Sequence, residues 1–268
     1  MNVELEKQAN APVLYRNSDG VAEIRFNRPA RLNAFSVEIA EGFAGAVDKA
    51  VEDPSVRVIV LASEGRAFVA GGDLEHLRKA QDKAQAAAEL IGPAHDALKR
   101  LASSPKISIA SLRGAAAGAG MSLALSVDLA IAAGDAKFNL AYVNVATSPD
   151  CGGSWALPRL VGMRKALEIA LLSETIDAQE ALRLGLVNRV VPLAELEAET
   201  AKVALRLAGG AGAAQGRTKS LMRMSFERSF DAQLDAEAES FAQCSVTQDF
   251  SEALEAFFHK RKPKFNGR

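Results

Sequence analysis

The sequence predicts an α/β fold in which stacked strand-strand-helix units are followed by a helical C-terminal region. Two continuous apolar runs, Val56–Leu61 and Ile107–Leu112, are typical of strands that are buried on both faces. Apolar residues recur at helical spacing before each run, and beyond Trp155 nearly all of the periodicity is helical. We therefore expect an α/β core over residues 1–200 and a helical region over residues 201–268.

The first half of the chain is expected to alternate between strands and helices. Val13–Tyr15 and Val21–Phe26 form a β-hairpin, because Asp19-Gly20 between them supplies the positive φ angles of a tight turn. Ser36 caps a helix that runs to Glu52 and precedes the first buried strand. The remaining elements are a helix over Asp82–Ala102, the strand Ile107–Leu112, a helix over Gly118–Leu125 and a short strand over Asp128–Ala132.

The second half is expected to consist of helices. Asp177 and Glu180 fit a capping box at the start of one of them, and Gly185 ends it. The basic tail at residues 260–264 has the composition of a solvated terminus or of a phosphate contact. The expected helices cover Leu157–Leu172, Ala178–Leu184, Leu193–Leu207, Gln215–Arg228, Phe230–Gln243 and Asp249–Lys260.

The composition disfavours several classes of partner. The 268 residues contain 32 Lys and Arg against 33 Asp and Glu, so the chain lacks the basic footprint of a nucleic-acid-binding protein. Cys151 and Cys244 are too few for a disulfide framework and too far apart for a zinc or redox motif, which predicts a reducing compartment and no bound metal. Residues 1–7 lack the apolar core of a signal peptide, and the apolar stretch 107–134 carries charges that argue against a membrane span. We therefore expect a cytoplasmic protein without nucleic-acid or membrane partners.

Two turns of small residues, Gly65–Asp73 and Gly114–Gly120, are the main functional signal. Each stands where a β-rich run ends and a helical run begins. Small residues let a ligand approach the backbone, and the N–H groups at a helix N-terminus point outward with the helix dipole behind them. Two such donors aimed at a carbonyl oxygen would stabilise an enolate or a tetrahedral anion. One turn of this kind is an ordinary connection, but two in this order predict an oxyanion hole.

Several motifs, in the same order along the chain, are shared with a known family. The chain resembles the crotonase superfamily, also called the enoyl-CoA hydratase/isomerase family, over almost its whole length. The segments that carry this resemblance are Phe26–Phe35, Ala67–Leu74, Gly114–Gly120, Leu157–Gly162, Ala178–Ala181 and Phe257–Pro263.

The resemblance implies stacked β-β-α units and an acyl-CoA thioester as ligand, with coenzyme A as part of the substrate and no further cofactor. It also implies a homotrimer, or a hexamer that is a dimer of trimers, assembled through the C-terminal helical region. The oxyanion donors would come from the turn Ala70–Gly72 and from Ala119, which replaces the middle glycine of the family's usual triplet. Contacts to the substrate or to its nucleotide are implied for Arg28, Arg31, Phe68, Ala70, Gly71, Gly72, Asp73, Leu74 and Lys260, the last toward a neighbouring subunit.

The residues that select the reaction depart from the family pattern. Hydratases of this type carry two glutamates that hold and split a water, and the matching positions here are Ser122 and Tyr142. A hydroxyl group with an ordinary pKa is a poor base near neutral pH. Hydration by the two-glutamate mechanism is therefore disfavoured.

Asp150 is the carboxylate that stands where the family can use one. It follows Tyr142 by eight residues, and its position is similar to that of the catalytic aspartate in dienoyl-CoA isomerases and some other enoyl-CoA isomerases. An Asp after Pro149 also suits a helix N-cap, which is the structural alternative. We expect Asp150 to move a proton between carbons of the acyl chain, so an enoyl-CoA isomerase is the first hypothesis.

Two other functions are compatible with the same residues. In 4-chlorobenzoyl-CoA dehalogenase, which belongs to this family, a nucleophilic aspartate, an aromatic residue and a histidine match Asp150, Tyr142 and His95; His95 would then activate the hydrolytic water. The helix around His95 carries no aromatic residue and Gly72 is small, which favours the isomerase. A solvated or locally paired His95, and Tyr142 as a wall of the acyl pocket, are the structural alternatives. A member that binds acyl-CoA without catalysis is the alternative of another class.

Overall fold

Six strands form the larger of two sheets in the computed structural model, which describes residues 10–267. Residues 1–9 and 268, and with them the expectation about an N-terminal signal peptide, lie outside the described part. Strands β1 and β2 form the predicted antiparallel hairpin, and all other pairs in this sheet are parallel. In spatial order the strands are β1 (Val13–Ser18), β2 (Val21–Phe26), β3 (Val58–Ser63), β5 (Ile107–Leu112), β7 (Leu129–Ala133) and β10 (Arg189–Val191).

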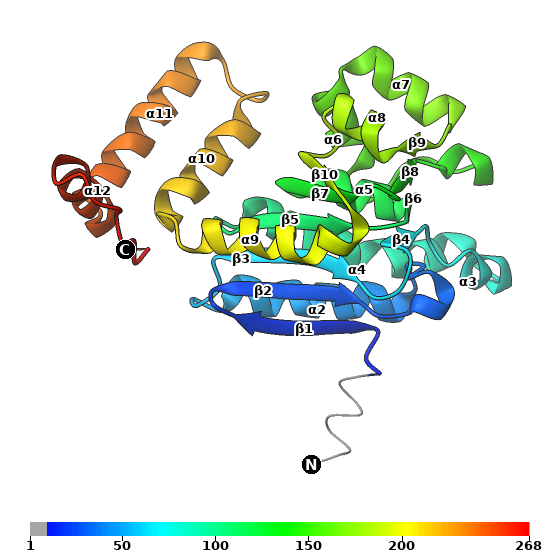
Figure 1. The fold of residues 1–268 in the computed structure, drawn as a ribbon. Helices are drawn as coiled ribbons and strands as arrows, with labels where there is room; N and C mark the ends of the chain where they lie inside the picture. Colours follow the sequence, from blue (N-terminus) through cyan, green and yellow to red (C-terminus); the bar gives the residue numbers. More distant parts are fainter. Residues whose placement is uncertain (1–9, 268) are drawn as a thin grey trace.

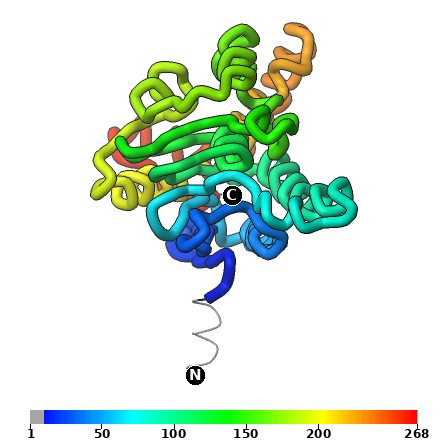
Figure 2. The backbone as a smooth tube through the Cα atoms, turned by 90° about the vertical axis from the view of Figure 1, so that its right-hand side faces the viewer, coloured from blue at the N-terminus to red at the C-terminus, as the bar shows by residue number. Residues whose placement is uncertain are grey.

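The central strand β3 is buried on both faces, as its continuous apolar sequence predicts. Ile59 and Leu61 pack in one cluster, with helices α2 (Val37–Glu52) and α4 (Lys83–Ser103). The alternate residues of β3 pack on the other face against α9 (Leu196–Ala208). Figure 2 shows the central strands, in green, between α9 in yellow and the teal segment of α3 and α4. The α/β class is therefore confirmed.

A second, smaller sheet supports the loops of the site. Strands β4, β6 and β8 are parallel, and β9 is antiparallel to β8. Each strand has only two or three residues, too few to show a periodicity in the sequence. The strands are β4 (Val69–Ala70), β6 (Ala115–Ala117), β8 (Lys137–Asn139) and β9 (Ile176–Asp177).

The bounds of the helices near the site are predicted only in part by the sequence. The helix expected over Leu157–Leu172 is wrong, because Gly162, with φ of 77° and ψ of 158°, divides it into α6 (Gly153–Val161) and α7 (Met163–Leu172). Apolar residues continue at helical spacing across the break, so periodicity alone could not reveal it. Helix α5 (Ala119–Ser126) follows the second glycine turn as predicted, whereas α3 (Leu74–Lys79) was not predicted. Asp177 caps α8 (Ala178–Arg183) by accepting the Glu180 N–H at 2.9 Å, which confirms that cap.

The C-terminal helices extend from the rest of the molecule as an arm (Figure 1). The arm consists of α10 (Gly212–Met224), α11 (Phe230–Ser245) and α12 (Gln248–Phe258). Its surface exposes large apolar side chains, and the expected trimer or hexamer, which stays a prediction, would cover such a surface. Across residues 10–267, no helix combines the length and the apolar character that a membrane crossing requires. The exposed phenylalanines of the arm and of the turn before α11 are Phe226, Phe230, Phe241, Phe257 and Phe258.

Candidate active site

The two glycine turns predicted from the sequence lie against each other. Parallel pairing of β4 with β6 brings them together, because each of the two segments contains one of these strands. A Cβ atom built on Gly118, whose φ is +51°, would lie 3.4 Å from the Cα of Gly71. A Cβ on Gly120 would lie 2.0 Å from the Val69 carbonyl oxygen, so only glycine allows this approach. The glycines thus let the two turns lie in direct contact with each other.

The backbone N–H groups of these turns differ in availability. The Ala70 N–H donates to the Leu32 carbonyl at 3.1 Å, so it already serves the fold. Ala119 is the first residue of α5, where an N–H has no acceptor within the helix. None of the hydrogen bonds found in residues 10–267 uses the N–H of Gly72 or of Ala119. Of the expected donors, Gly72 and Ala119 are thus available and Ala70 is not.

A cavity of about 430 Å³ opens beside the two free N–H groups. Helices α3 and α4 form its apolar wall, and the loop that ends at Cys151 closes the opposite side. Asp150 is the one carboxylate among the described residues that line it. The apolar wall is formed by Leu74, Leu77, Ala87, Leu90 and Ile91.

Asp150 belongs to a chain of hydrogen bonds that leads into the core. The Tyr142 hydroxyl donates to Asp150 Oδ1, and Ser122 Oγ lies 3.0 Å from the same hydroxyl. Because the single Tyr142 proton goes to the carboxylate, the Ser122 hydroxyl is the donor to Tyr142. Ser122 is fully buried and Tyr142 is 8 % exposed, whereas Asp150 is half-buried at the cavity. The network therefore holds Oδ1 of the Asp150 carboxylate through the Tyr142 hydroxyl.

The helix-cap alternative for Asp150 is wrong. Helix α6 begins at Gly153 with Gly152 as its N-cap residue, and no side chain caps it. The backbone carbonyl of Asp150, not its carboxylate, accepts the Gly153 N–H at 3.0 Å. The carboxylate is thus free for chemistry in the cavity.

Burial and the charge of Asp150 keep the Tyr142 hydroxyl and the Cys151 thiol protonated. Burial is the larger cause that raises the pKa of Tyr142, and the adjacent Asp150 carboxylate raises this pKa further. Burial and Asp150 likewise raise the pKa of the Cys151 thiol well above its usual range. Tyr142 therefore acts here as a hydrogen-bond donor, and Cys151 is not a thiolate nucleophile.

Comparison with known proteins assigns the chain. The family model described as enoyl-CoA hydratase/isomerase matches residues 16–268. The chain belongs to the enoyl-CoA hydratase/isomerase family. It is 34% identical over 261 residues to the trans-2-decenoyl-[acyl-carrier-protein] isomerase of Streptococcus mutans, a match that covers 96% of this chain and 98% of the relative. A probable enoyl-CoA hydratase of Rhodobacter capsulatus is 36% identical over 256 residues, with coverage of 96% and 98%.

A solved structure of the same family has the same fold. The putative enoyl-CoA hydratase/isomerase from Mycobacterium abscessus superimposes with a TM-score of 0.91 at 35% identity, covering 96% of this chain and all of that one. The family thus includes proteins named as isomerases and proteins named as hydratases, and the family name alone does not select the reaction.

His95 lies next to the Asp150 loop but on the side away from the cavity. Its Nε2 accepts the Cys151 N–H at 3.0 Å. It lines a separate cavity of about 340 Å³, together with Ser126 and Trp155. The lone pair that a hydrolytic base would use is occupied, and His95 is not among the residues that line the substrate-sized cavity with Asp150. In a family member of the dehalogenase type, His95 would activate the hydrolytic water. The geometry disfavours this role.

The side chains of two residues of the Ala67–Leu74 motif serve the fold. Phe68 is fully buried, with its ring centroid 5.6 Å from that of Phe26, so its side chain does not line the cavity, and the ligand contact expected for Phe68 stays a prediction. Asp73 caps α3 by accepting the N–H groups of Glu75 and His76 at 3.1 and 3.2 Å. Of this motif, Leu74 and the turn Ala70–Gly72 reach the cavity.

The expected nucleotide contacts lie outside the cavity. Arg28 Nη1 donates to the carbonyl groups of Asn10 and Asn27, both at 3.0 Å. Arg31 is exposed, 3.8 Å from Glu75. Lys260 follows α12 at the end of the arm, on the opposite side of the molecule from α3 (Figure 1). Within one chain, Lys260 is thus remote from this cavity.

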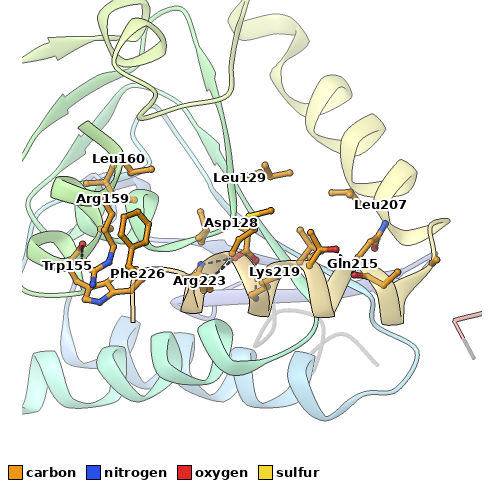
Figure 3. Close-up of a pocket in the computed structure, with 18 residues that line it drawn as sticks. Asp128, Leu129, Trp155, Arg159, Leu160, Leu207, Gln215, Lys219, Arg223 and Phe226 are labelled. Carbon is orange, nitrogen blue, oxygen red and sulfur yellow. Dashed lines mark hydrogen bonds and ion pairs between the residues drawn. The ribbon is translucent and has the colours of Figure 1, made fainter. Parts of the chain in front are cut away.

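Another cavity, of about 650 Å³, is lined by a structural ion cluster (Figure 3). Asp128 lies 3.0 Å from Lys219 Nζ and 2.7 Å from Arg223 Nη2. Lys219 also donates to the carbonyl groups of Leu101 and Lys106, at 2.7 and 2.8 Å. The Lys219 ammonium has a partner for each of its hydrogens, so this cluster stabilises the junction of α10 with the sheet.

Proposed function

We propose that the protein is an isomerase that moves a double bond along the acyl chain of an enoyl thioester, with Asp150 as its acid-base group. The observation that carries this proposal is the placement of Asp150. It is the single carboxylate among the described residues of the cavity and lies there with the free N–H groups of Gly72 and Ala119. The relative named as a trans-2-decenoyl-[acyl-carrier-protein] isomerase supports an isomerase, and the family supports an acyl-CoA substrate.

The proposed reaction needs one base and no added water. The Asp150 carboxylate removes a proton from the α or γ carbon, and the electron pair of that C–H bond moves to the thioester oxygen to form a dienolate. The N–H groups of Gly72 and Ala119 donate to this oxygen, at about 2.7–4 kcal/mol of transition-state stabilisation for each donor. Asp150 then returns the proton at the other carbon, while the Tyr142 hydroxyl holds the carboxylate in place.

The cavity favours an aliphatic acyl chain. Its wall on α3 and α4 is made of Leu77, Ala87, Leu90 and Ile91, without an aromatic side chain. The aromatic residues of the lining, Phe35 and Tyr142, lie outside these two helices. The apolar wall on α3 and α4 suits a flexible alkyl chain, which supports an enoyl thioester as substrate.

Deuterium exchange tests the proposed function. In D₂O with 3-enoyl-CoA and 2-enoyl-CoA esters, we expect NMR to show deuterium at the α and γ carbons and migration of the double bond. Addition of water to the 2-enoyl ester without migration would establish a hydratase instead. Binding of the esters without exchange or turnover would establish an acyl-CoA-binding protein and contradict the proposal.

Ala119→Pro is expected to remove the proposed anion donor and leave the fold intact. Proline is favoured at the first position of a helix, because its φ angle suits that position and the missing N–H has no helical acceptor. We expect kcat for exchange to fall by about 10²–10³-fold, with an unchanged circular dichroism spectrum. Ala119→Gly keeps the N–H and should lose far less activity. Equal activity of the two variants would show that this N–H does not contribute.

A further inference from the structure

The backbone directly after Asp150 adopts an unfavourable conformation that surrounding contacts must stabilise. Cys151 has a φ of +48°, and Gly152 follows with a φ of +79°. The left-handed conformation is unfavourable for a residue with a Cβ, because this atom comes too close to the backbone. Such a residue keeps this conformation only where its surroundings determine it. The direction of the Asp150 side chain therefore depends on what holds Cys151.

Three hydrogen bonds hold this turn. The Gly153 N–H donates to the Asp150 carbonyl at 3.0 Å, within the turn itself. Ser126 Oγ on α5 donates to the Cys151 carbonyl at 2.8 Å. The Cys151 N–H donates to His95 Nε2 on α4 at 3.0 Å. Only the last of these bonds has a side-chain nitrogen as its acceptor.

The direction of the bond specifies the protonation state of His95. An imidazole nitrogen accepts a hydrogen bond only through a free lone pair, so the ring is neutral and carries its proton on Nδ1. A protonated ring would place an N–H against the Cys151 N–H. The bond would then be lost, and the donor that determines the Cys151 conformation would be left without a partner.

The His95 ring is accessible from a cavity other than the proposed substrate cavity. The cavity of about 340 Å³ that it lines is separate from the cavity of Asp150. Lys99 of α4 and Arg223 of α10 line it too. The charged groups around the ring thus include these two cations and, beyond Cys151, the Asp150 carboxylate. The partners of the cations are Asp96, 3.0 Å from Lys99 Nζ, and Asp128, 2.7 Å from Arg223 Nη2.

We propose that neutral His95 is a positioning residue, which accepts the Cys151 N–H and thereby keeps the Asp150 carboxylate directed toward Tyr142 and the acyl cavity. The inference rests on the proposed role of Asp150. The bond forms only while Nε2 is unprotonated, so a protonated His95 no longer holds the Cys151 N–H, and Asp150 loses this support without any change in the substrate cavity.

The test compares His95→Gln, whose side-chain oxygen accepts a hydrogen bond but does not titrate, with His95→Leu, which cannot accept one. Proton exchange from the enoyl thioester is measured from pH 5 to pH 9. We expect His95→Leu to lower kcat on the order of tenfold, with KM little changed. His95→Gln should restore kcat and lack the acidic decline of the parent enzyme. His259→Gln, at an exposed position on the arm, should keep the parent profile.

Two results would overturn the proposal. One is an unchanged acidic decline in His95→Gln together with full kcat in His95→Leu. The other is equal inactivity of the two variants at every pH, which would indicate a chemical role for the imidazole.

Hydrogen exchange of the Cys151 amide separates this inference from the proposed function, because it needs no turnover. The protection factor of this amide, the intrinsic exchange rate divided by its observed rate at the same pH, should be high in the parent protein and in His95→Gln, and at least tenfold lower in His95→Leu and in the parent at low pH. Protection that is independent of residue 95 and of pH would contradict the positioning role even if Asp150 proves catalytic. Protection that follows residue 95 in a protein without isomerase activity would instead contradict the proposed function alone.

Discussion

Asp150→Asn is expected to lower kcat for proton exchange by about 10²–10⁴-fold, the range that a positioned general base contributes. The amide cannot take a proton from carbon, but it has nearly the same volume and an oxygen that accepts the Tyr142 hydroxyl. Substrate contacts of the apolar wall and of the two free N–H groups remain. KM should therefore change little, and the loss should lie in kcat.

A matched substitution distinguishes this loss from a general effect of removing a carboxylate. Asp96 lies on α4 with its side chain 72% exposed and pairs with Lys99. Asp96→Asn is expected to leave exchange unchanged. Exchange that persists at the parent rate in Asp150→Asn would remove Asp150 from the mechanism.

Asp128→Asn is expected to produce the largest loss of stability. It removes the charge that faces Lys219, whose side chain is 4% exposed, and Arg223. Removing one partner of a buried ion pair leaves an uncompensated charge, at a cost of about 3–5 kcal/mol in the free energy of unfolding. Urea unfolding should show this as a lower midpoint with an unchanged slope. A midpoint within the error of the parent would show that the two carbonyl groups bound to Lys219 suffice.

The same cluster predicts how stability depends on pH. Burial by itself would raise the pKa of Asp128, but the charges of Lys219 and Arg223 outweigh it and hold this pKa below its usual value. A carboxyl group with a lowered pKa stabilises the folded state above its unfolded pKa of about 3.9, and this contribution is lost as the pH falls through the folded pKa. The pKa of Lys219 is also lowered, because burial outweighs the attraction of Asp128. The acid dependence is thus assigned to Asp128.

Thermal unfolding of the parent and of Asp128→Asn checks this sign. The difference in Tm should be large at pH 7 and should shrink below about pH 4, where the parent loses the Asp128 charge. A difference that grows toward acidic pH would contradict the assignment.

Residues that act locally could be interpreted from the sequence. Asp19-Gly20 predicted the hairpin, and the continuous apolar run of β3 predicted a strand with both faces covered. Gly118 and Gly120 predicted a close backbone approach before α5. Each of these inferences depends on a conformation or a periodicity that a few neighbouring residues impose.

Contacts between distant segments could not be predicted in this way. The packing of the Phe68 ring against Phe26 of β2 is one example, because no local pattern records that contact. The helix break at Gly162 was missed because a glycine inside an apolar period is compatible with either outcome. The short strands of the smaller sheet are formed by their pairing and not by their own sequence.

For this protein the sequence by itself determined the fold class, the family resemblance, the two glycine turns and the choice of Asp150, because these depend on residue type and on spacing along the chain. Only the tertiary structure decided that the Ala70 N–H is occupied, that Asp150 receives the Tyr142 proton and that His95 faces Cys151 from behind the cavity. The physical reason is that the partner of a hydrogen-bond donor or of a lone pair determines whether that group serves the fold or the site. Packing, not sequence spacing, brings these partners within hydrogen-bonding distance of each other.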